Sequence, residues 1–281
     1  MRSTNCSADL ARDHDVQYVA TVPQPVVVVE RQASPNRDPR PVGQRIDMLV
    51  VHYTGMVDAA AAIARLCDPA TKVSAHYLID EDGRIVQLVP DVMRAWHAGV
   101  STWAGASDIN ARSIGIELVN PGHEFGYRRF ADAQMRSLIA LARAVVNRHA
   151  IPAARVLGHS DVAPGRKADP GELFDWARLA RHGIGLWPTH WSRAENGVAS
   201  TAGGGLKAGD RGEPVLAMQR DFAAYGYGVA AGGEFDQPTE QVVIAFQRHF
   251  RSARIDGIFD RDCAERLRAL LKLGATCANR L

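Results

Sequence analysis

Two runs of nearly uninterrupted apolar residues constrain the fold more than any other feature of the chain. Residues 46–53 read IDMLVVHY, and residues 113–119 read SIGIELV. A strand with one face in water alternates apolar and polar side chains, whereas a strand covered on both faces is apolar almost throughout. Both runs therefore predict strands at the centre of a covered sheet.

The segments around these runs carry the signals of further strands and helices. Residues 132–149 place apolar side chains at the spacing of one helix face. Residues 80–83, which end in Asp-Gly, predict a tight turn between two strands. The other predicted elements are a short strand at 26–29, an Ala-rich helix at 58–66, strands at 74–79 and 84–88, and a helix at 173–182.

The composition changes after residue 191, which indicates a domain boundary. Residues 192–205 contain a Gly-Gly-Gly run with Ser, Thr and Ala, a composition typical of flexible linkers. The block that follows contains three amphipathic helices, predicted at 215–225, 238–250 and 261–271. We predict an irregular segment at 1–24, an α/β domain at 25–191, the linker at 192–205 and a three-helix domain at 206–273.

The composition also excludes several classes of protein. The 281 residues carry a formal net charge of +2, and no segment is dominated by Lys or Arg, which argues against a nucleic-acid binder. No run of 18 apolar residues is present, so we expect no transmembrane helix. Residues 1–15 lack the apolar segment of a secretory signal, and we expect no export signal there.

The four cysteines, Cys6, Cys67, Cys263 and Cys277, form no CxxC pair and no zinc-finger spacing. Cys67 lies in the Ala-rich helical stretch and is expected to pack as a small hydrophobic residue. Cys263 and Cys277 flank the last predicted helix, and their spacing leaves both a disulfide and two free thiols open. Cysteine usage therefore does not fix the redox compartment.

One loop brings together residue types that are used in metal chemistry. Residues 158–171 read GHSDVAPGRKADPG, and their prolines and glycines predict an irregular loop. The loop contains His159 and Asp169 ten positions apart, with Lys167 between them. A loop held by a rigid scaffold can present such side chains at one point.

The two apolar strands add His52 and Glu117 to this set. Glu117 is the more unusual, because a buried carboxylate costs free energy unless it is paired, lies near a metal or works as an acid or base. The alternatives are an edge strand whose Glu117 faces water and a hydrogen-bonded core histidine at position 52. Together, His52, His159 and Asp169 would leave a fourth coordination position open, as in catalytic zinc sites, although other divalent metals accept the same ligands.

This set of residues suits the hydrolysis of an amide. A metal lowers the pKa of a bound water and polarises a carbonyl oxygen. Glu117 would take the proton of the water and deliver it to the leaving amine. Lys167 would stabilise the oxyanion of the tetrahedral intermediate, with an exposed loop lysine as the alternative.

Other histidines compete for roles at such a site. His97 stands beside Trp96 in a long loop, and both are candidates for substrate contact. His76 lies in a predicted strand and is a third candidate if it faces the site. His149 and His182 lie at predicted helix C-termini, where a cation is favourable, and are not candidates.

Five segments resemble, in order and approximate spacing, the N-acetylmuramoyl-L-alanine amidases of the type-2 amidase family. They are residues 51–54, 73–77, 95–99, 113–117 and 158–171, and the resemblance covers roughly residues 25–191. It is strongest to the branch that includes the bacterial recycling amidase and its lipoprotein and periplasmic relatives. The resemblance implies a mixed β-sheet with helices on both faces. It also implies cleavage of the amide between the lactyl group of N-acetylmuramic acid and L-alanine.

The resemblance also implies a role for each candidate residue. The zinc ligands would be His52, His159 and Asp169. Glu117 would be the catalytic acid and base, and Lys167 would stabilise the transition state. Zinc is therefore the cofactor that we expect.

The second block resembles the small three-helix peptidoglycan-binding module. The similar segments are residues 209–212, 215–219, 235–236, 245–247 and 256–257. A wall-binding module on a flexible linker would raise the local concentration of substrate, whereas the alternative is a bundle that only packs. Peptidoglycan or muropeptides are therefore the expected partners, with the oligomeric state left open.

The sequence is compatible with two cellular locations and with three functions. The binding module favours a periplasmic or cell-wall-facing location, although no signal peptide is visible, and a cytoplasmic location is the alternative. A catalytically silent peptidoglycan-recognition protein would share the fold, but it would be expected to lack one of the metal ligands. A metallopeptidase acting within the stem peptide is the third possibility.

Overall fold

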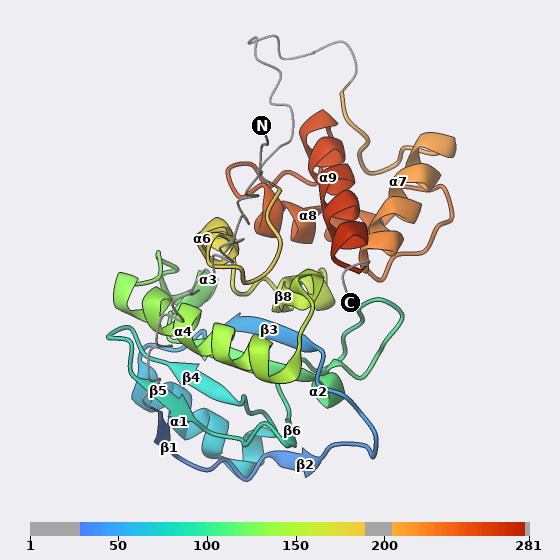
Figure 1. The fold of residues 1–281 in the computed structure, drawn as a ribbon. Coiled ribbons are helices and arrows are strands. Elements are labelled where there is room, and N and C mark those ends of the chain that lie inside the picture. The colour runs from blue at the N-terminus through green and yellow to red at the C-terminus, as the bar shows by residue number, and fades with distance from the viewer. Residues whose placement is uncertain (1–28, 189–203, 279–281) are drawn as a thin grey trace, which may run out of the picture.

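The computed structural model describes residues 29–188 and 204–278, with side chains up to residue 274 (Figure 1). The predicted N-terminal segment, most of the strand at 26–29 and most of the linker lie outside these residues. Among the helices of the described ranges, none has the length and apolar character that crossing a membrane requires.

The first domain is built on a six-stranded sheet. Its strands are β1 (Glu30–Arg31), β3 (Met48–Tyr53), β4 (Tyr77–Ile79), β5 (Ile85–Gln87), β7 (Ser113–Leu118) and β8 (Val156–Gly158). Their order is β1–β5–β4–β7–β3–β8, and all neighbours are parallel except the antiparallel pair β4–β5. The mixed sheet is thus confirmed. A separate pair is formed by β2 (Arg37–Pro39) and β6 (Met93–Ala95).

Helices cover both faces of the sheet, as expected (Figure 1). In the first domain they are α1 (Ala59–Cys67), α2 (Ile109–Arg112), α3 (Gly122–Phe125), α4 (Asp132–His149), α5 (His159–Val162) and α6 (Trp176–Arg181), with 3-10 turns at Pro69–Thr71 and Ala153–Arg155. Side chains of a strand alternate between faces. Leu49 and Val51 of β3 therefore point to one face, where they pack in a cluster with residues of α4 and α6.

The opposite face of the sheet is covered by α1 over one part and by helices of the second domain over another. The second domain consists of α7 (Glu213–Tyr225), α8 (Gln237–Phe250) and α9 (Arg261–Ala278), which confirms the three-helix domain. Helix α1 packs against side chains of β4 and β5. Met48 and Val50 of β3 instead share a cluster with Phe222 of α7 and Phe246 of α8.

This shared cluster joins the two domains through buried aromatic side chains. Trp103, in the loop before α2, is only 1% exposed, and its ring lies 4.9 Å from that of Tyr227 and 5.7 Å from that of Tyr225. Gly226 fits against the indole, because a Cβ atom there would come within 2.5 Å of it. The idea of a binding module that moves freely on its linker does not fit this packing.

The observed elements differ from the predicted ones at several points, since β2, β6, α2 and α3 were not predicted. The segment 158–171 was predicted as irregular throughout, but it begins with the short helix α5. The carboxylate of Asp161 accepts the backbone N–H of Gly158 at 2.7 Å, a cap that stabilises the first turn. The strand predicted at 74–79 contains regular pairing only over β4, and the last helix runs beyond residue 271 to the end of α9.

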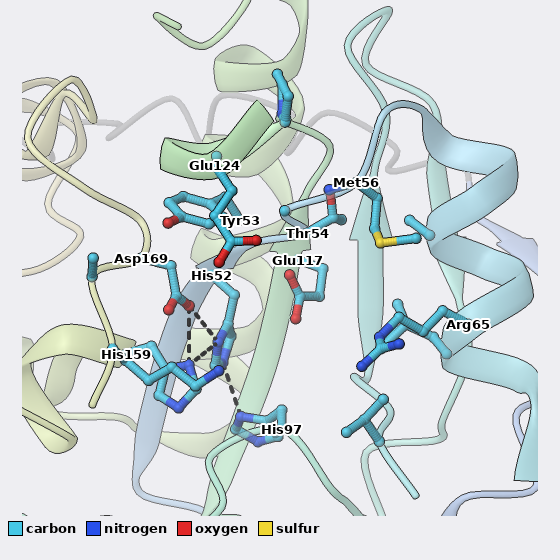
Figure 2. Close-up of a pocket in the computed structure, with 18 of the residues that line it drawn as sticks. His52, Tyr53, Thr54, Met56, Arg65, His97, Glu117, Glu124, His159 and Asp169 are labelled. Atoms are coloured by element: carbon cyan, nitrogen blue, oxygen red, sulfur yellow. Dashed lines mark hydrogen bonds and ion pairs between the residues drawn. The ribbon is translucent and has the colours of Figure 1, made fainter. Parts of the chain in front are cut away.

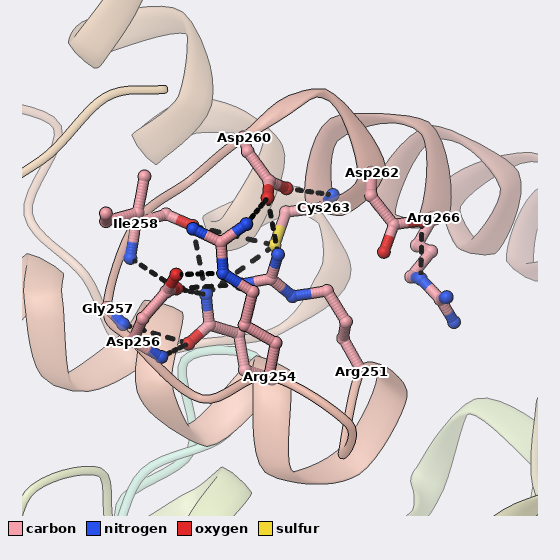
Figure 3. Close-up of polar contacts among 10 residues, drawn as sticks. Arg251, Arg254, Asp256, Gly257, Ile258, Asp260, Asp262, Cys263 and Arg266 are labelled. Carbon is pink, nitrogen blue, oxygen red and sulfur yellow. Dashed lines mark hydrogen bonds and ion pairs between the residues drawn. The ribbon is translucent and has the colours of Figure 1, made fainter. Parts of the chain in front are cut away.

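Polar contacts fix the turn that follows α8 (Figure 3). The amide oxygen of Gln247 accepts the backbone N–H groups of Asp256 and Gly257 at 2.9 and 3.0 Å. Its amide nitrogen donates to the carbonyl oxygen of Ile258 at 2.9 Å. Arg251 donates to the carboxylate of Asp256 at 2.8 Å. The Asp-Gly pair that carried the second resemblance therefore belongs to the internal scaffold of this domain.

Two cysteines can be placed in this fold. Cys67 is half-buried at the end of α1 and packs against the cluster beneath that helix, as expected. Cys263 is buried and has a free thiol. The side chain of Cys277 lies outside the described residues, so both alternatives for Cys263 and Cys277, a disulfide and two free thiols, stay as the sequence left them.

Candidate active site

Three neighbouring strands bring the predicted residues to one edge of the sheet. His52 of β3 lies beside Glu117 in the register with β7, and β8 leads directly into His159 at the start of α5. Because β7, β3 and β8 are parallel, their carboxyl ends lie at the same edge, where open α/β sheets place their sites. Asp169 reaches the same point from the loop after α5 (Figure 2).

His52, His159 and Asp169 meet in one tight contact. The Nδ1 atoms of the two histidines are 3.0 Å apart, and each lies 3.0 Å from Oδ2 of Asp169. The three residues are 1%, 4% and 6% exposed, in that order. The loop of residues 158–171 therefore brings Asp169 back to His159, and both reach the end of β3.

This arrangement fits a small divalent cation. Hydrogen bonds cannot satisfy all three contacts at once, because each imidazole carries at most one hydrogen on Nδ1. A tetrahedral zinc site with metal–ligand distances of about 2.0–2.1 Å places its ligand atoms roughly 3.3–3.4 Å apart, close to the observed 3.0 Å. Two imidazoles and a carboxylate are also ligands that zinc accepts. Three protein ligands leave a position for water or substrate.

The electrostatics of the ligands favour their metal-binding forms. Burial lowers the pKa of His52 to about 4, so its imidazole is neutral at pH 7. Burial alone would raise the pKa of Asp169, but the adjacent His159 and His52 hold that pKa far below its usual range. A neutral imidazole and an ionised carboxylate are the forms that bind metals.

Glu117 lies on the central strand β7, which excludes the edge-strand alternative. Its Oε2 atom is shielded from solvent and has no hydrogen-bond partner among the described residues. Burial raises the pKa of Glu117 well above its usual range, the negative charge of Asp169 adds to this effect, and Lys167 opposes it. A carboxyl with a raised pKa can both accept and return a proton near neutral pH.

A pocket of about 690 Å³ opens above these residues. His52, Glu117, His159 and Asp169 line it (Figure 2). Lys167 belongs to the same lining. The Lys167 side chain is exposed, and its charge acts on the pKa of both Glu117 and His52. Lys167 therefore faces the pocket, which makes the alternative of an unrelated loop lysine the weaker one.

The three residues suggested as substrate contacts have different surroundings. Trp96 is half-buried and lines the pocket, and its indole N–H donates to Asp38 at 2.7 Å. His97 also lines the pocket wall but is only 8% exposed. His76 is fully buried outside the pocket lining, where its Nδ1 accepts the backbone N–H of Gly115 at 3.0 Å. The structure therefore brings Trp96 and His97 to the pocket and keeps His76 away from it.

Two arginines of the pocket were missed in the sequence. Arg65 lines the pocket from α1 and is the only charged residue of that helix, which was the available signal. Arg166 lines the pocket from the loop that was singled out, next to Lys167. Its Nη2 donates to the carbonyl oxygen of Ala98 at 2.5 Å.

Comparison with known protein families finds two matches. Residues 42–172 match the model of the N-acetylmuramoyl-L-alanine amidase family, and residues 211–267 match that of a putative peptidoglycan binding domain. The first match contains all five residues predicted to form the catalytic site. The second covers α7, α8 and the first part of α9.

Individual relatives agree with these matches. The chain is 39% identical to the N-acetylmuramoyl-L-alanine amidase AmiD of Escherichia coli over 242 residues, which are 81% of this chain and 83% of the relative. It is 40% identical to the 1,6-anhydro-N-acetylmuramyl-L-alanine amidase AmpD of Escherichia coli over 55% of this chain and 91% of the relative.

Solved structures of similar proteins extend over both domains. The Escherichia coli AmiD complex with anhydro-N-acetylmuramic acid-L-Ala-D-gamma-Glu-L-Lys has a TM-score of 0.68 and 35% identity, over 83% of this chain and 92% of that one. Pseudomonas aeruginosa AmpDh3 in complex with anhydromuramic pentapeptide has a TM-score of 0.66 and 32% identity, over 83% and 94% of the two chains.

Proposed function

The chain belongs to the N-acetylmuramoyl-L-alanine amidase family, and from this membership we propose that it cleaves the amide between N-acetylmuramic acid and the L-alanine of peptidoglycan stem peptides. The observation that carries the proposal is the mutual 3.0 Å contact of His52, His159 and Asp169 at the base of a large pocket. Glu117 lies directly beside His52 in the sheet. Relatives that match most of their own length to this chain are named as amidases of this bond.

Zinc is the proposed cofactor, held by Nδ1 of His52, Nδ1 of His159 and Oδ2 of Asp169. When bound, the ion supplies polarisation of the scissile carbonyl and a water of lowered pKa. Burial keeps the imidazole of His52 neutral, and the carboxylate of Asp169 is ionised, so these two ligands need not lose protons when the metal binds.

Glu117 is the proposed acid and base. Its carboxylate takes a proton from the attacking water and later delivers it to the nitrogen of the leaving L-alanine. The raised pKa of Glu117 suits this double role, because the carboxyl holds a proton more readily than an exposed glutamate does. Oε2 has no hydrogen-bond partner among the described side chains, so no hydrogen bond at that oxygen stabilises the ionised form, in agreement with the raised pKa of Glu117.

Lys167 is proposed to stabilise the oxyanion that develops on the scissile carbonyl. Lys167 belongs to the pocket lining, and a positive charge placed where negative charge develops lowers the barrier of the reaction. Trp96 is proposed to contact the substrate from the pocket wall, since it lines the pocket and its N–H is held by Asp38.

The substrates that we propose are soluble muropeptides and peptidoglycan strands. Structures of two similar amidases hold anhydromuramic peptides, and a peptidoglycan-binding domain is packed beside the proposed site here. The same two observations connect the protein with the cell wall, and we propose that it works on the periplasmic side.

The test is digestion of purified sacculi and of soluble anhydromuropeptides by the zinc-loaded full chain, with all products identified by mass. We expect intact stem peptides that begin with L-alanine, together with glycan that keeps its complete muramic acid. Shortened peptides would identify a metallopeptidase instead. Binding without any cleavage would identify a recognition protein.

A further inference from the structure

A chain of hydrogen bonds runs from His52 into the protein, away from the pocket. Nε2 of His52 lies 3.0 Å from Nδ1 of His97, and Nε2 of His97 lies 3.1 Å from Oγ of Ser113. The hydroxyl of Ser113 lies 2.6 Å from the backbone carbonyl oxygen of Ile109. Ser113 and Ile109 are fully buried, and His97 is 8% exposed, so the far end of this chain is protein.

The carbonyl of Ile109 fixes the direction of every hydrogen in the chain. A carbonyl oxygen only accepts, so the hydroxyl of Ser113 donates to it and has no second hydrogen to give. Nε2 of His97 must then donate to Ser113, which leaves Nδ1 of His97 as an acceptor. Nε2 of His52 donates to that acceptor, and Nδ1 of His52 is left with a lone pair. That lone pair belongs to the atom that meets His159 and Asp169.

The residue after His97 does the same for the second histidine. Nε2 of His159 donates to the carbonyl oxygen of Ala98 at 3.0 Å, so Nδ1 of His159 is also left with a lone pair. Arg166 lies farther from this nitrogen, at 3.4 Å, and its guanidinium donates to the same carbonyl. The adjacent residues His97 and Ala98 thus accept the Nε2–H groups of His52 and His159, respectively.

The segment that holds these two residues is itself fixed from two sides. The side-chain oxygen of Asn110 accepts the backbone N–H groups of His97 and Ala98, at 3.0 and 2.8 Å. The ring of His97 lies flat on Gly115 of β7, because a Cβ atom there would come within 2.5 Å of the imidazole. His97 therefore has little freedom to turn toward the pocket.

We propose that His97 is a positioning residue that holds His52 in the tautomer able to bind zinc, while the carbonyl of Ala98 does the same for His159. The proposal rests on the zinc site of the proposed function. It differs from the earlier interpretation of His97 as a substrate contact. Removal of a residue that accepts a hydrogen bond from a metal-binding histidine typically weakens metal binding by roughly 10–100-fold.

The test uses the full-length protein with His97→Phe and His97→Asn. Phenylalanine keeps a flat ring on Gly115 but removes the acceptor for His52, whereas the amide of asparagine can replace the acceptor at Nδ1. We expect His97→Phe to weaken zinc binding roughly 10–100-fold in a chelator competition assay, and His97→Asn to restore much of this loss. The exposed His182→Phe serves as the matched control and should bind zinc like the wild type.

A second readout examines the tautomer directly. In nitrogen-15 NMR spectra of the zinc-free protein, His52 should carry its hydrogen on Nε2 in the wild type and populate both tautomers in His97→Phe. Unchanged zinc affinity together with an unchanged His52 tautomer in His97→Phe would overturn the proposal. Loss of muropeptide hydrolysis with unchanged zinc affinity would also overturn it and support substrate contact instead. Because zinc affinity and the tautomer of His52 are both measured without hydrolysis, a wild-type protein that binds zinc but cleaves nothing would refute only the proposed function.

Discussion

Nδ1 of His249, on α8 of the second domain, lies 2.7 Å from Oδ2 of Asp161 on α5, the helix that begins with His159. Asp161 is fully buried and also accepts hydrogen bonds from the hydroxyl of Tyr227 and the backbone N–H of Gly158, both at 2.7 Å. One carboxylate thus caps the helix of a proposed zinc ligand and holds two elements of the second domain. The peptidoglycan-binding domain is part of the scaffold of the site.

The first prediction concerns this contact. His249→Ala removes one partner of a buried carboxylate and the stacking of the imidazole on Trp176, whose ring lies 3.8 Å away. We expect the free energy of unfolding of the full chain to fall by about 2–4 kcal/mol. Urea unfolding measures it, with the exposed His182→Ala as the control, which should stay within about 0.5 kcal/mol of the wild type. Equal losses in both variants would contradict a stabilising role of the contact.

The second prediction concerns metal binding by His159. Because His159 supplies one of three closely spaced donor atoms, His159→Ala should no longer hold stoichiometric zinc. Ligand binding stabilises a folded protein, by about 2.7 kcal/mol when the free ligand is at 100 times its Kd. Adding zinc should therefore raise the melting temperature of the wild type but not that of His159→Ala. A variant that still binds one zinc ion and gains the same stability would remove His159 from the site.

Elements that are marked by a pattern in their own residues, such as helical spacing or a run of apolar side chains, could be predicted from the sequence. Helix α4 was expected at 132–149 and extends over the same residues, because its apolar side chains repeat at helical spacing. The two apolar runs form the neighbouring strands β3 and β7, and their register brings His52 beside Glu117. The contact of His52, His159 and Asp169 could be predicted because these residues stand at strand ends and in one loop, where parallel strands bring side chains together.

Features that depend on distant partners could not be predicted in this way. Nothing local to Trp103 indicates that its ring packs against Tyr227 of the second domain. The same holds for His97, which the sequence shows only as a histidine beside a tryptophan in a loop. Its inward orientation depends on Gly115, a residue on a strand that is distant in the sequence. Such contacts arise from tertiary packing, which neither composition nor periodicity encodes.

The third prediction concerns the chemistry of Glu117. Glutamine has nearly the same shape but cannot accept a proton from the attacking water, so Glu117→Gln should hydrolyse muropeptides at least about a hundredfold more slowly. Zinc content should stay at the wild-type level, because Glu117 is not one of the three residues in the ligand contact. Hydrolysis rates and zinc content are measured on the same preparations. Full activity of the variant would remove Glu117 from the mechanism.

The fourth prediction concerns the pH dependence of stability in the zinc-free protein. Burial raises the pKa of Glu117 well above its usual range, whereas a glutamate in the unfolded chain titrates near about 4.3. The folded state therefore holds this proton more tightly. Its contribution to stability is complete below about pH 4.3 and is lost as the pH rises through the folded pKa, since the unfolded chain ionises first.

Glu117→Gln cannot ionise and should keep this stability. Relative to the wild type, the free energy of unfolding of the variant should gain up to about 1.4 kcal/mol for each pH unit above about 4.3, until the folded carboxyl ionises as well. Urea unfolding of both zinc-free proteins between about pH 4 and pH 8 measures this difference. If the difference stays constant over that range, the Glu117 carboxyl ionises equally in the folded and unfolded states. Burial would then not raise the pKa of Glu117. A difference that grows with pH would show that this glutamate destabilises the fold at neutral pH, as expected of a residue retained for catalysis.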